Sequence, residues 1–280
     1  MDSEYQLLDS GNSRKLERFG AYVLSRPCAQ AVWNPSLNLS AWEEAHASFS
    51  REGREGWTFR TKLPSSWTVF INGISFSIHP TDFGHLGVFP EQRHFWEKIR
   101  QVCQKRKEPQ VLNLFAYSGG STLAAAQGGA RVCHLDASKG MVQQARENAQ
   151  LNGLEKAPIR WIVEDVMKFL QREIRRGKTY DGIILDPPSF GRGSKGEVFK
   201  IEDDILPLLK ACKMCLSKAP LFVLFSCHTP TFSPLAMRHL LEDFMLQGAI
   251  DSGEMVLEND DPAIRPIPSG TFALWSAEND

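Results

Sequence analysis

Short apolar runs alternate with longer amphipathic stretches from about residue 111 to residue 219. The runs lie at residues 111–117, 131–137, 159–166, 180–188 and 221–227, and the stretches between them have helical spacing of apolar positions. One stretch, MVQQARENAQLNG, closes on Asn152-Gly153, which is typical of a helix C-terminus. This alternation predicts βαβ units and a parallel sheet covered by helices on both faces. Short strands are also expected at 253–258 and 271–277, so we predict a doubly wound, mostly parallel α/β fold with an antiparallel edge.

The first part of the chain lacks this rhythm. It is rich in Trp, Phe, Ser and Gly, and its β-prone pieces include Trp67–Ile71 and Ile74–Ile78, separated by Asn-Gly, a strong hairpin signal. We therefore expect a small β-rich N-terminal module over residues 1–84. A hairpin-and-helix linker is expected over 85–108, and the α/β domain over 109–280.

Composition and cysteine usage narrow the class of protein. The chain has 280 residues, of which 42% are hydrophobic and 23% charged, as in ordinary globular proteins. No apolar run approaches the ~18 residues that a spanning helix needs, and the N-terminus lacks signal-peptide features, so we expect a cytoplasmic protein without a membrane partner. The six cysteines are scattered, and the one CxxC, Cys212 and Cys215, is expected on a helix face rather than at a metal.

The balance of charge is close to neutral. The net charge is −1, which counts against a broad nonspecific grip on nucleic acid but leaves room for a local patch. The only dense basic runs are 104–107 (QKRK) and 172–178 (REIRRGK), and the simplest interpretation is that both are solvated helix ends and turns.

Candidate chemistry lies where the predicted strands end, because open α/β sheets bind ligands beyond their carboxyl ends. The first run leads into a loop of small residues, 115–121, and the next three end in Asp136, in Glu164-Asp165 and in Asp186-Pro187-Pro188. Each signal alone has a simple alternative, a plain turn or a helix N-cap. Their order predicts an adenosyl-binding site without a pyrophosphate cradle. The missing GxGxxG pattern disfavours a nicotinamide dehydrogenase.

On these residues the chain resembles the class I S-adenosylmethionine-dependent methyltransferases. The stretches VLNLFAYSGGSTLAAAQGGARVCHLDAS, LNG, DGIILDPPSF and FSC are similar to the bacterial 23S ribosomal RNA methyltransferases of the cytosine-5 type and to their guanine-N7 relatives. GVFPEQRHFWEKI resembles the linker of that group, and the likeness covers about residues 85–230. It implies a Rossmann-like methyltransferase sheet, S-adenosylmethionine as cofactor and an RNA substrate with its base flipped into the site. Residues 1–84 show no recognisable RNA-binding module of the PUA type.

The resemblance also implies which residues form the site. The cofactor would contact a linker glutamine, the small-residue loop and the residues after each strand: Gln92, Phe115, Ala116, Tyr117, Ser118, Gly119, Asp136, Ala137, Ser138, Asp165, Val166 and Asp186. The substrate would contact the segment after Asp186: Pro187, Phe190, Arg192 and Lys195. Phe190 is expected to stack on the base, with burial in the core as the alternative. Residues 191–195 are expected to form a mobile lid, with a solvated loop as the alternative.

The acceptor decides which further residue the chemistry needs. Carbon 5 of a pyrimidine becomes nucleophilic only after a thiolate adds at carbon 6. Cys227 aligns with the family nucleophile, so we expect Cys227 and Asp186 to be catalytic, with His228 as a base or orienting group. If Cys227 is a buried small hydrophobe instead, the protein would be an N-methyltransferase on guanine, a protein or a small molecule. A noncatalytic adenosine-ligand or RNA-binding module is disfavoured by the acids at 136, 165 and 186.

Overall fold

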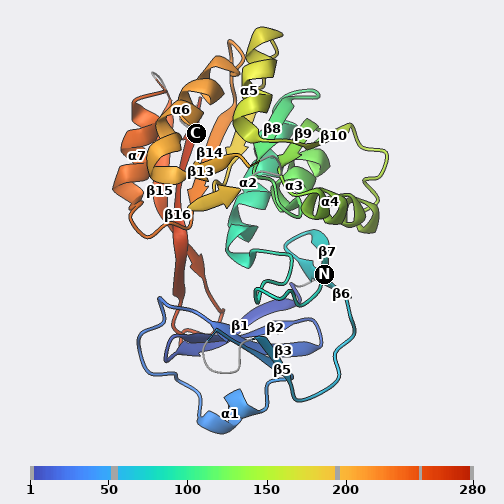
Figure 1. Ribbon diagram of the computed structural model, residues 1–280, viewed down its shortest axis with the longest axis vertical. Coiled ribbons are helices and arrows are strands. Elements are labelled where there is room, and N and C mark those ends of the chain that lie inside the picture. The colour runs from blue at the N-terminus through green and yellow to red at the C-terminus, as the bar shows by residue number, and fades with distance from the viewer. Residues whose placement is uncertain (1–2, 52–55, 193–195, 246–247, 278–280) are drawn as a thin grey trace. The chain divides into compact units, whose positions relative to one another are not determined.

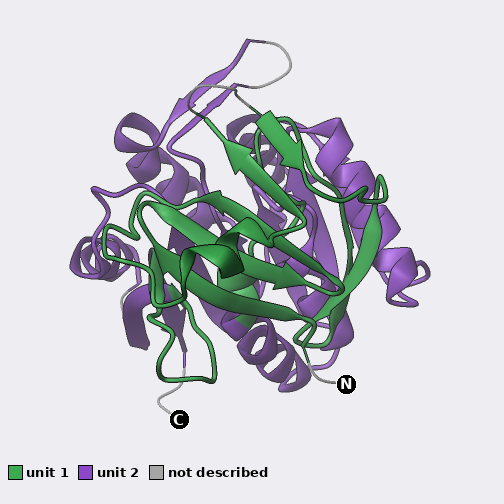
Figure 2. Ribbon diagram, turned by 90° about the horizontal axis from the view of Figure 1, so that it is seen from below, with its two compact units in different colours: residues 1–93, 256–269 green, residues 94–255, 270–280 purple. Residues whose placement is uncertain are grey.

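The computed structural model describes residues 3–51, 56–192, 196–245 and 248–277. The chain divides into two compact units (Figure 2). Unit 1 comprises residues 1–93 and 256–269, and unit 2 comprises 94–255 and 270–280. The three-part division at residues 84 and 108 stays a prediction.

Unit 1 is built mainly of β-strands. A five-stranded sheet has the order β1-β2-β3-β4-β5, with strands Tyr5–Gly11, Arg14–Phe19, Tyr22–Pro27, Ala47–Ser50 and Gly56–Phe59. The unit also contains α1 (Leu39–Glu43) and the 3-10 turn η1 (Pro90–Gln92). The predicted hairpin is confirmed as β6 (Trp67–Ile71) paired antiparallel with β7 (Ile74–Ile78). Asn72 and Gly73 both have positive φ, 46° and 87°, as a tight two-residue hairpin turn requires.

Unit 2 contains a seven-stranded sheet in the order β10-β9-β8-β11-β14-β16-β15 (Figure 1). The five parallel strands are β8 (Gln110–Leu114), β9 (Arg131–Asp136), β10 (Ile159–Val163), β11 (Gly182–Leu185) and β14 (Phe222–Cys227). The predicted antiparallel edge is confirmed, because β16 (Ile267–Ser276) pairs antiparallel with β14 and lies next to β15 (Ala249–Leu257). The doubly wound, mostly parallel sheet with a separate β-rich N-terminal module is therefore the fold that the sequence predicted.

Helices cover both faces of this sheet. They are α2 (Arg93–Gln104), α3 (Gly120–Gln127), α4 (Lys139–Leu151), α5 (Val166–Arg175), α6 (Ile201–Met214) and α7 (Pro234–Glu242). On one face, α5, α6 and α7 bury side chains against alternate residues of the strands, among them Leu112, Leu114, Ile183 and Leu185. On the other, α3 and α4 come so close that a Cβ at Gly119 would lie 3.1 Å from Ala145 Cβ. Because every central strand is buried on both faces, its residues are nearly all apolar, which explains the continuous runs in the sequence.

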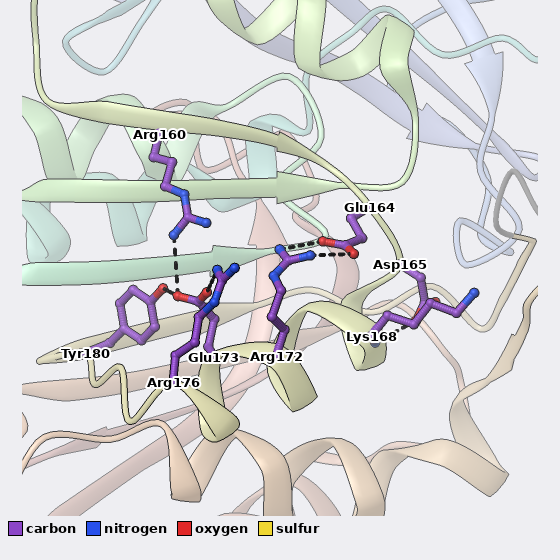
Figure 3. A network of polar contacts seen from close by, with 8 residues as sticks. All are labelled: Arg160, Glu164, Asp165, Lys168, Arg172, Glu173, Arg176 and Tyr180. Atoms are coloured by element: carbon purple, nitrogen blue, oxygen red, sulfur yellow. Dashed lines mark hydrogen bonds and ion pairs between the residues drawn. The ribbon is translucent and has the colours of Figure 1, made fainter.

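A buried acid fixes α5 on the sheet (Figure 3). Glu173 is 1% exposed, accepts a hydrogen bond of 2.8 Å from the Tyr180 hydroxyl and pairs with Arg160 at 3.4 Å and Arg176 at 3.5 Å. Burial raises the pKa of Tyr180, and its bond to Glu173 acts in the same direction. A buried carboxylate with these partners holds the helix in one register, because removing a partner would leave an uncompensated buried polar group.

Three further properties of the described residues concern metal ions, membranes and disulfides. No group of three or more His, Cys, Asp or Glu side chains in the described part of the chain is arranged to hold a metal ion. Among the same residues, no helix is both long and apolar enough to cross a lipid bilayer. The six cysteines are all free and buried.

Candidate active site

The five parallel strands deliver the predicted site residues to one edge of the sheet. Leu114 of β8 is level with Leu135 of β9, and Asp136 is level with Val163 of β10. On the other side, Leu185 of β11 is level with both Leu114 and Phe225. The segments that follow these strands therefore share the carboxyl edge of the sheet, where α/β folds bind ligands.

The loop after β8 has an unusual backbone. Phe115, Tyr117 and Gly119 have φ values of 55°, 49° and 93°, in the left-handed region that non-glycine residues seldom adopt. Neighbouring elements fix this conformation: Ala116 N donates to Leu135 O at 3.0 Å, and the Asn148 side chain of α4 donates to Ser118 O at 2.9 Å. Such strain, held by the surrounding structure, is typical of a ligand cradle.

Asp136 connects this loop to the next helix. Its Oδ2 accepts from Tyr117 N at 2.9 Å, and its Oδ1 accepts from Ser138 N at 2.8 Å. Burial raises the pKa of Asp136, and the two backbone bonds oppose that shift. Ser138 itself caps α4 by accepting from Met141 N, so the N-cap alternative holds for Ser138 and not for the acid. Each carboxylate oxygen therefore has a fixed direction and further lone-pair capacity.

The two acids after β10 have different surroundings (Figure 3). Glu164 accepts two bonds from Arg172 of α5, at 2.8 and 2.6 Å, a bidentate pair. Asp165 is the N-cap of α5 and accepts from Lys168 N at 2.9 Å. Val166, the first residue of α5, is buried. Glu164 is thus committed to Arg172, whereas the Asp165 carboxylate makes a single capping bond among the contacts described.

Asp186 follows β11 directly, ahead of Pro187 and Pro188. His228 Nε2 lies 3.7 Å from Asp186 Oδ2, and the Ser189 and Thr229 hydroxyls are 2.6 Å apart. These contacts join the segment after β11 to the segment after β14. The prolines fix φ in a loop that side-chain contacts already restrain.

Cys227, the last residue of β14, belongs to the apolar core cluster. Its side chain is 0% exposed, and its Sγ accepts from Thr229 N at 3.4 Å. Burial raises the pKa of the thiol above its ordinary value, the bonds from Thr229 lower it, and the charge of Asp186 raises it again. The thiol therefore lies within electrostatic reach of Asp186 and is protonated at neutral pH.

A two-stranded hairpin follows the prolines. Phe190–Arg192 forms β12, and Val198–Lys200 forms β13. Phe190 is 50% exposed, so it is not a core residue, and the Arg192 guanidinium lies over its ring at 5.7 Å. Phe199, on the opposite face of the hairpin, packs on Phe115 with ring centroids 5.3 Å apart. Lys195 lies outside the described residues.

The structure thus brings together the predicted residues that follow β8, β9, β10, β11 and β14. Gln92 is the exception, because it lies in η1 within unit 1, where it is buried. Its contact with a cofactor stays a prediction. Sequence reasoning missed Asn148 and Phe199. For Asn148, the only sequence signal is an amide on the apolar face of a helix. For Phe199, it is an alternation of apolar and polar residues only three residues long.

Comparison with known proteins identifies the family. The family model for S-adenosylmethionine-dependent methyltransferases matches residues 52–234, about two thirds of the chain. The chain belongs to that family. It is an enzyme, and its cofactor is S-adenosylmethionine.

Similar proteins agree with this assignment. The chain is 37% identical over 151 residues to the ribosomal RNA large subunit methyltransferase K/L of Pseudoalteromonas atlantica, covering 53% of this chain and 20% of that protein. It is 29% identical over 209 residues to the ribosomal RNA large subunit methyltransferase I of Tolumonas auensis, covering 72% and 50%. A crystal structure of a SAM-dependent methyltransferase from Agrobacterium tumefaciens is 40% identical, with a TM-score of 0.94 over 99% of this chain and 91% of that one. The chain spans half or less of the length of these two curated relatives.

The carboxyl edge fits this cofactor in two respects. In the loop 115–119, contacts from Leu135 O and Asn148 hold the strained backbone in one conformation, as in a ligand cradle, and Gly119 lets α4 pack closely against it. At Asp136, both oxygens are already oriented by backbone donors and can each accept a further bond, as two ribose hydroxyls require. The edge also carries acids rather than a cationic phosphate cradle, which suits a cationic sulfonium.

Proposed function

We propose that this methyltransferase modifies ribosomal RNA at carbon 5 of a cytosine, with Cys227 as the nucleophile. One observation carries the proposal. Asp186 follows Leu185, which is level with Phe225, so Cys227 ends its strand one residue beyond the level of Asp186. The ends of β11 and β14 therefore place an aspartate and a cysteine on neighbouring strands at the carboxyl edge, where the charge of Asp186 acts on the thiol. The relatives named as ribosomal RNA large subunit methyltransferases support the choice of RNA.

Residues of this edge would hold the cofactor. The loop 115–119 would enclose its methionine end, Asp136 its ribose, with Ala137 and Ser138 beside it, and Asp165 and Val166 its adenine. When bound, S-adenosylmethionine supplies an electrophilic methyl group to carbon 5 of the base. The protein's contribution is to align the acceptor with that group and to keep the site's electrostatics fixed.

Cys227 and its neighbours would make carbon 5 nucleophilic. The thiol gives its proton to the Asp186–His228 pair, and the thiolate adds to carbon 6 of the cytosine to form a carbon–sulfur bond. Asp186 also orients the base through N3 or the exocyclic amine. After methylation, a base removes the carbon 5 proton, the carbon–sulfur bond breaks, and the thiolate is released to be reprotonated. Ser189 occupies the position of the helper cysteine that some RNA enzymes carry, and it is engaged with Thr229.

The outer face of the β12–β13 hairpin would receive the RNA. Phe190, Arg192, Val198 and Lys200 are exposed, and the pairing of β12 with β13 places them on the same face. An exposed ring with a guanidinium beside it is a suitable surface for a flipped base and its phosphate. Pro187, between Asp186 and this hairpin in the chain, would contact the substrate as well.

Nitrogen methylation is the second candidate, because one observation favours it. Cys227 is fully buried with a raised pKa, whereas the carboxylate of Asp186 and the ring of His228 are accessible, with side chains 24% and 35% exposed. An amine or ring nitrogen of guanine needs only such orienting groups and no thiolate.

Substitution of Cys227 separates the two chemistries. The assay follows methyl transfer from radiolabelled cofactor to ribosomal RNA from cells that lack the enzyme, and mass spectrometry identifies the modified nucleotide. We expect Cys227→Ala to lower the rate by about 10⁴-fold or more, as loss of a covalent nucleophile does. Cys215→Ala is the matched control, since Cys215 is also 0% exposed but lies at the end of α6. Full activity of Cys227→Ala would reject the carbon 5 mechanism in favour of nitrogen.

A further inference from the structure

A hollow of unit 2 lies at the edge of the sheet opposite the acids. It measures about 1200 Å³ and is lined by the segment after α2, the segment before β14 and the end of β16. β8 and β14 begin at this edge, and Ser276 of the antiparallel β16 is level with Phe222, the first residue of β14. The hollow is therefore separated from the cofactor edge by the length of the parallel strands.

Its lining is strongly basic, although the chain as a whole has a net charge of −1. Five cations surround it, and one acid accompanies them: Lys98, Lys105, Arg106, Lys213, Lys218 and Asp251. We call this feature the basic hollow. The run QKRK, which the sequence alone suggests is a solvated helix end, contributes two of the cations, Lys105 and Arg106. The other three lie 7 to 112 residues from the nearer of these two in sequence.

The cations of the basic hollow differ in whether they form ion pairs with acidic side chains. Lys98 pairs with Asp251 at 3.3 Å, and Arg106 pairs with Asp181 at 2.6 Å while donating to Ala219 O. Lys213 and Lys218 are exposed and make no ion pair with another residue of the described part of the chain. Beneath them the walls are mainly aliphatic, with Leu216, Leu221 and Leu274, and the two aromatic residues of the lining, Phe244 and Trp275, are buried. Unneutralised lysines above aliphatic walls suit a sugar–phosphate backbone, because no exposed aromatic ring is available there for stacking on a base.

We propose that the basic hollow binds the phosphate backbone of the RNA substrate, at a distance from the nucleotide being methylated. This inference rests on the proposed RNA substrate. Phosphate contacts supply much of the affinity for nucleic acid and need clustered cations. At the catalytic edge the described hairpin supplies two, Arg192 and Lys200. A second cluster on the same unit provides the additional electrostatic contact that a near-neutral enzyme needs.

The test is the salt dependence of RNA binding by the full chain. The variant Lys213→Glu/Lys218→Glu is compared with Lys62→Glu/Lys156→Glu, which makes the same change of charge at exposed lysines outside the hollow. The probe is an unmodified transcript of large-subunit ribosomal RNA, titrated by filter binding at several KCl concentrations. We expect the slope of log affinity against log salt to fall by about 1.5 in the hollow variant, the loss of two phosphate contacts. We expect affinity to fall roughly tenfold, with unchanged binding of S-adenosylmethionine and little effect in the control.

Three outcomes would overturn the proposal. An unchanged slope with a lower melting temperature would mean that the lysines only stabilise helix ends. An equal loss in the control variant would mean that general charge, not the hollow, governs binding. Loss of methylation only in ribosomal particles, with naked RNA bound normally, would assign the hollow to an acidic protein partner. Failure of the wild type itself to bind the transcript is a different result, because it rejects the RNA substrate rather than the hollow alone.

Discussion

The two ends of the parallel strands in unit 2 carry opposite charges. At the carboxyl edge, Asp136, Asp165 and Asp186 lie at the ends of β9, β10 and β11, and each is held by backbone or side-chain contacts. At the other edge, the basic hollow gathers five cations, two of which make no ion pair with described residues. The acids are fixed in position, whereas the lysines are long, exposed side chains.

This difference indicates two kinds of recognition. Fixed acids select a ligand with hydroxyl and amine donors in defined places, which suits the adenosyl cofactor. Flexible cations attract any polyanion and determine affinity rather than specificity. A net charge of −1 conceals this separation, because the opposite charges lie at opposite edges and cancel in the sum.

After the loss expected for Cys227→Ala, the largest effect on the rate expected at the carboxyl edge is its dependence on pH. Because the pKa of Cys227 is raised, its thiolate is a small fraction at neutral pH and increases about tenfold per pH unit below that pKa. The single-turnover rate with saturating RNA and cofactor should therefore rise by up to about a hundredfold between about pH 7 and pH 9. Quenched-flow measurements with the wild type and the Cys215→Ala control provide the profile.

The same profile can also contradict the thiolate mechanism. A rate that is flat above about pH 7 shows that no thiol titrates in the rate-limiting step, as nitrogen methylation requires. If the rate rises with pH and the methyl group is found on carbon 5 of cytosine, the carboxyl edge is a covalent catalytic site as well as a binding site.

A smaller effect is expected from the two acids after β10, which form a matched pair. Asp165→Ser retains an N-cap for α5 but removes the carboxylate, so we expect S-adenosylmethionine to bind roughly tenfold more weakly. Glu164→Gln weakens only the pair with Arg172, so we expect unchanged cofactor affinity and a loss of stability below about 1 kcal/mol. Calorimetry and thermal unfolding measure both. Equal losses of affinity in the two variants would mean that the β10 end acts as one structural unit and not through Asp165.

Much of the fold of unit 2 could be predicted because its signals are local. Strands buried on both faces are apolar throughout, whereas the helices between them have one apolar and one polar face. The order of strands and helices therefore follows from the pattern of apolar residues. The hairpin at Asn72-Gly73 could also be predicted from a local signal, because a turn with two positive φ values accepts few residue types other than Asn and Gly. The grouping of 256–269 with the N-terminal strands could not be predicted, because it depends on long-range contacts such as Asn259 with Leu7.

The site could be predicted in part for the same reason. Asp136 and Asp186 are identified by their place after a strand, which the sequence shows. The commitment of Glu164 to Arg172, the burial of Cys227 and the contact of Phe199 with Phe115 depend on side-chain packing, which it does not show. The basic hollow could not be predicted, because its cations come from segments far apart in the chain and only QKRK forms a continuous basic run.

The most direct test of the account is calorimetric titration of S-adenosylmethionine into the wild type and Asp136→Ala. The aspartate accepts from two backbone N–H donors, which orient it, and it would accept from two ribose hydroxyls, so its removal should weaken binding by at least about a hundredfold. The Lys62→Glu/Lys156→Glu protein, in which none of the proposed site residues is changed, should bind as the wild type does. We expect one binding site per chain in the wild type and loss of measurable heat in Asp136→Ala. Equal affinity in the two proteins, or no binding by the wild type, would contradict this expectation.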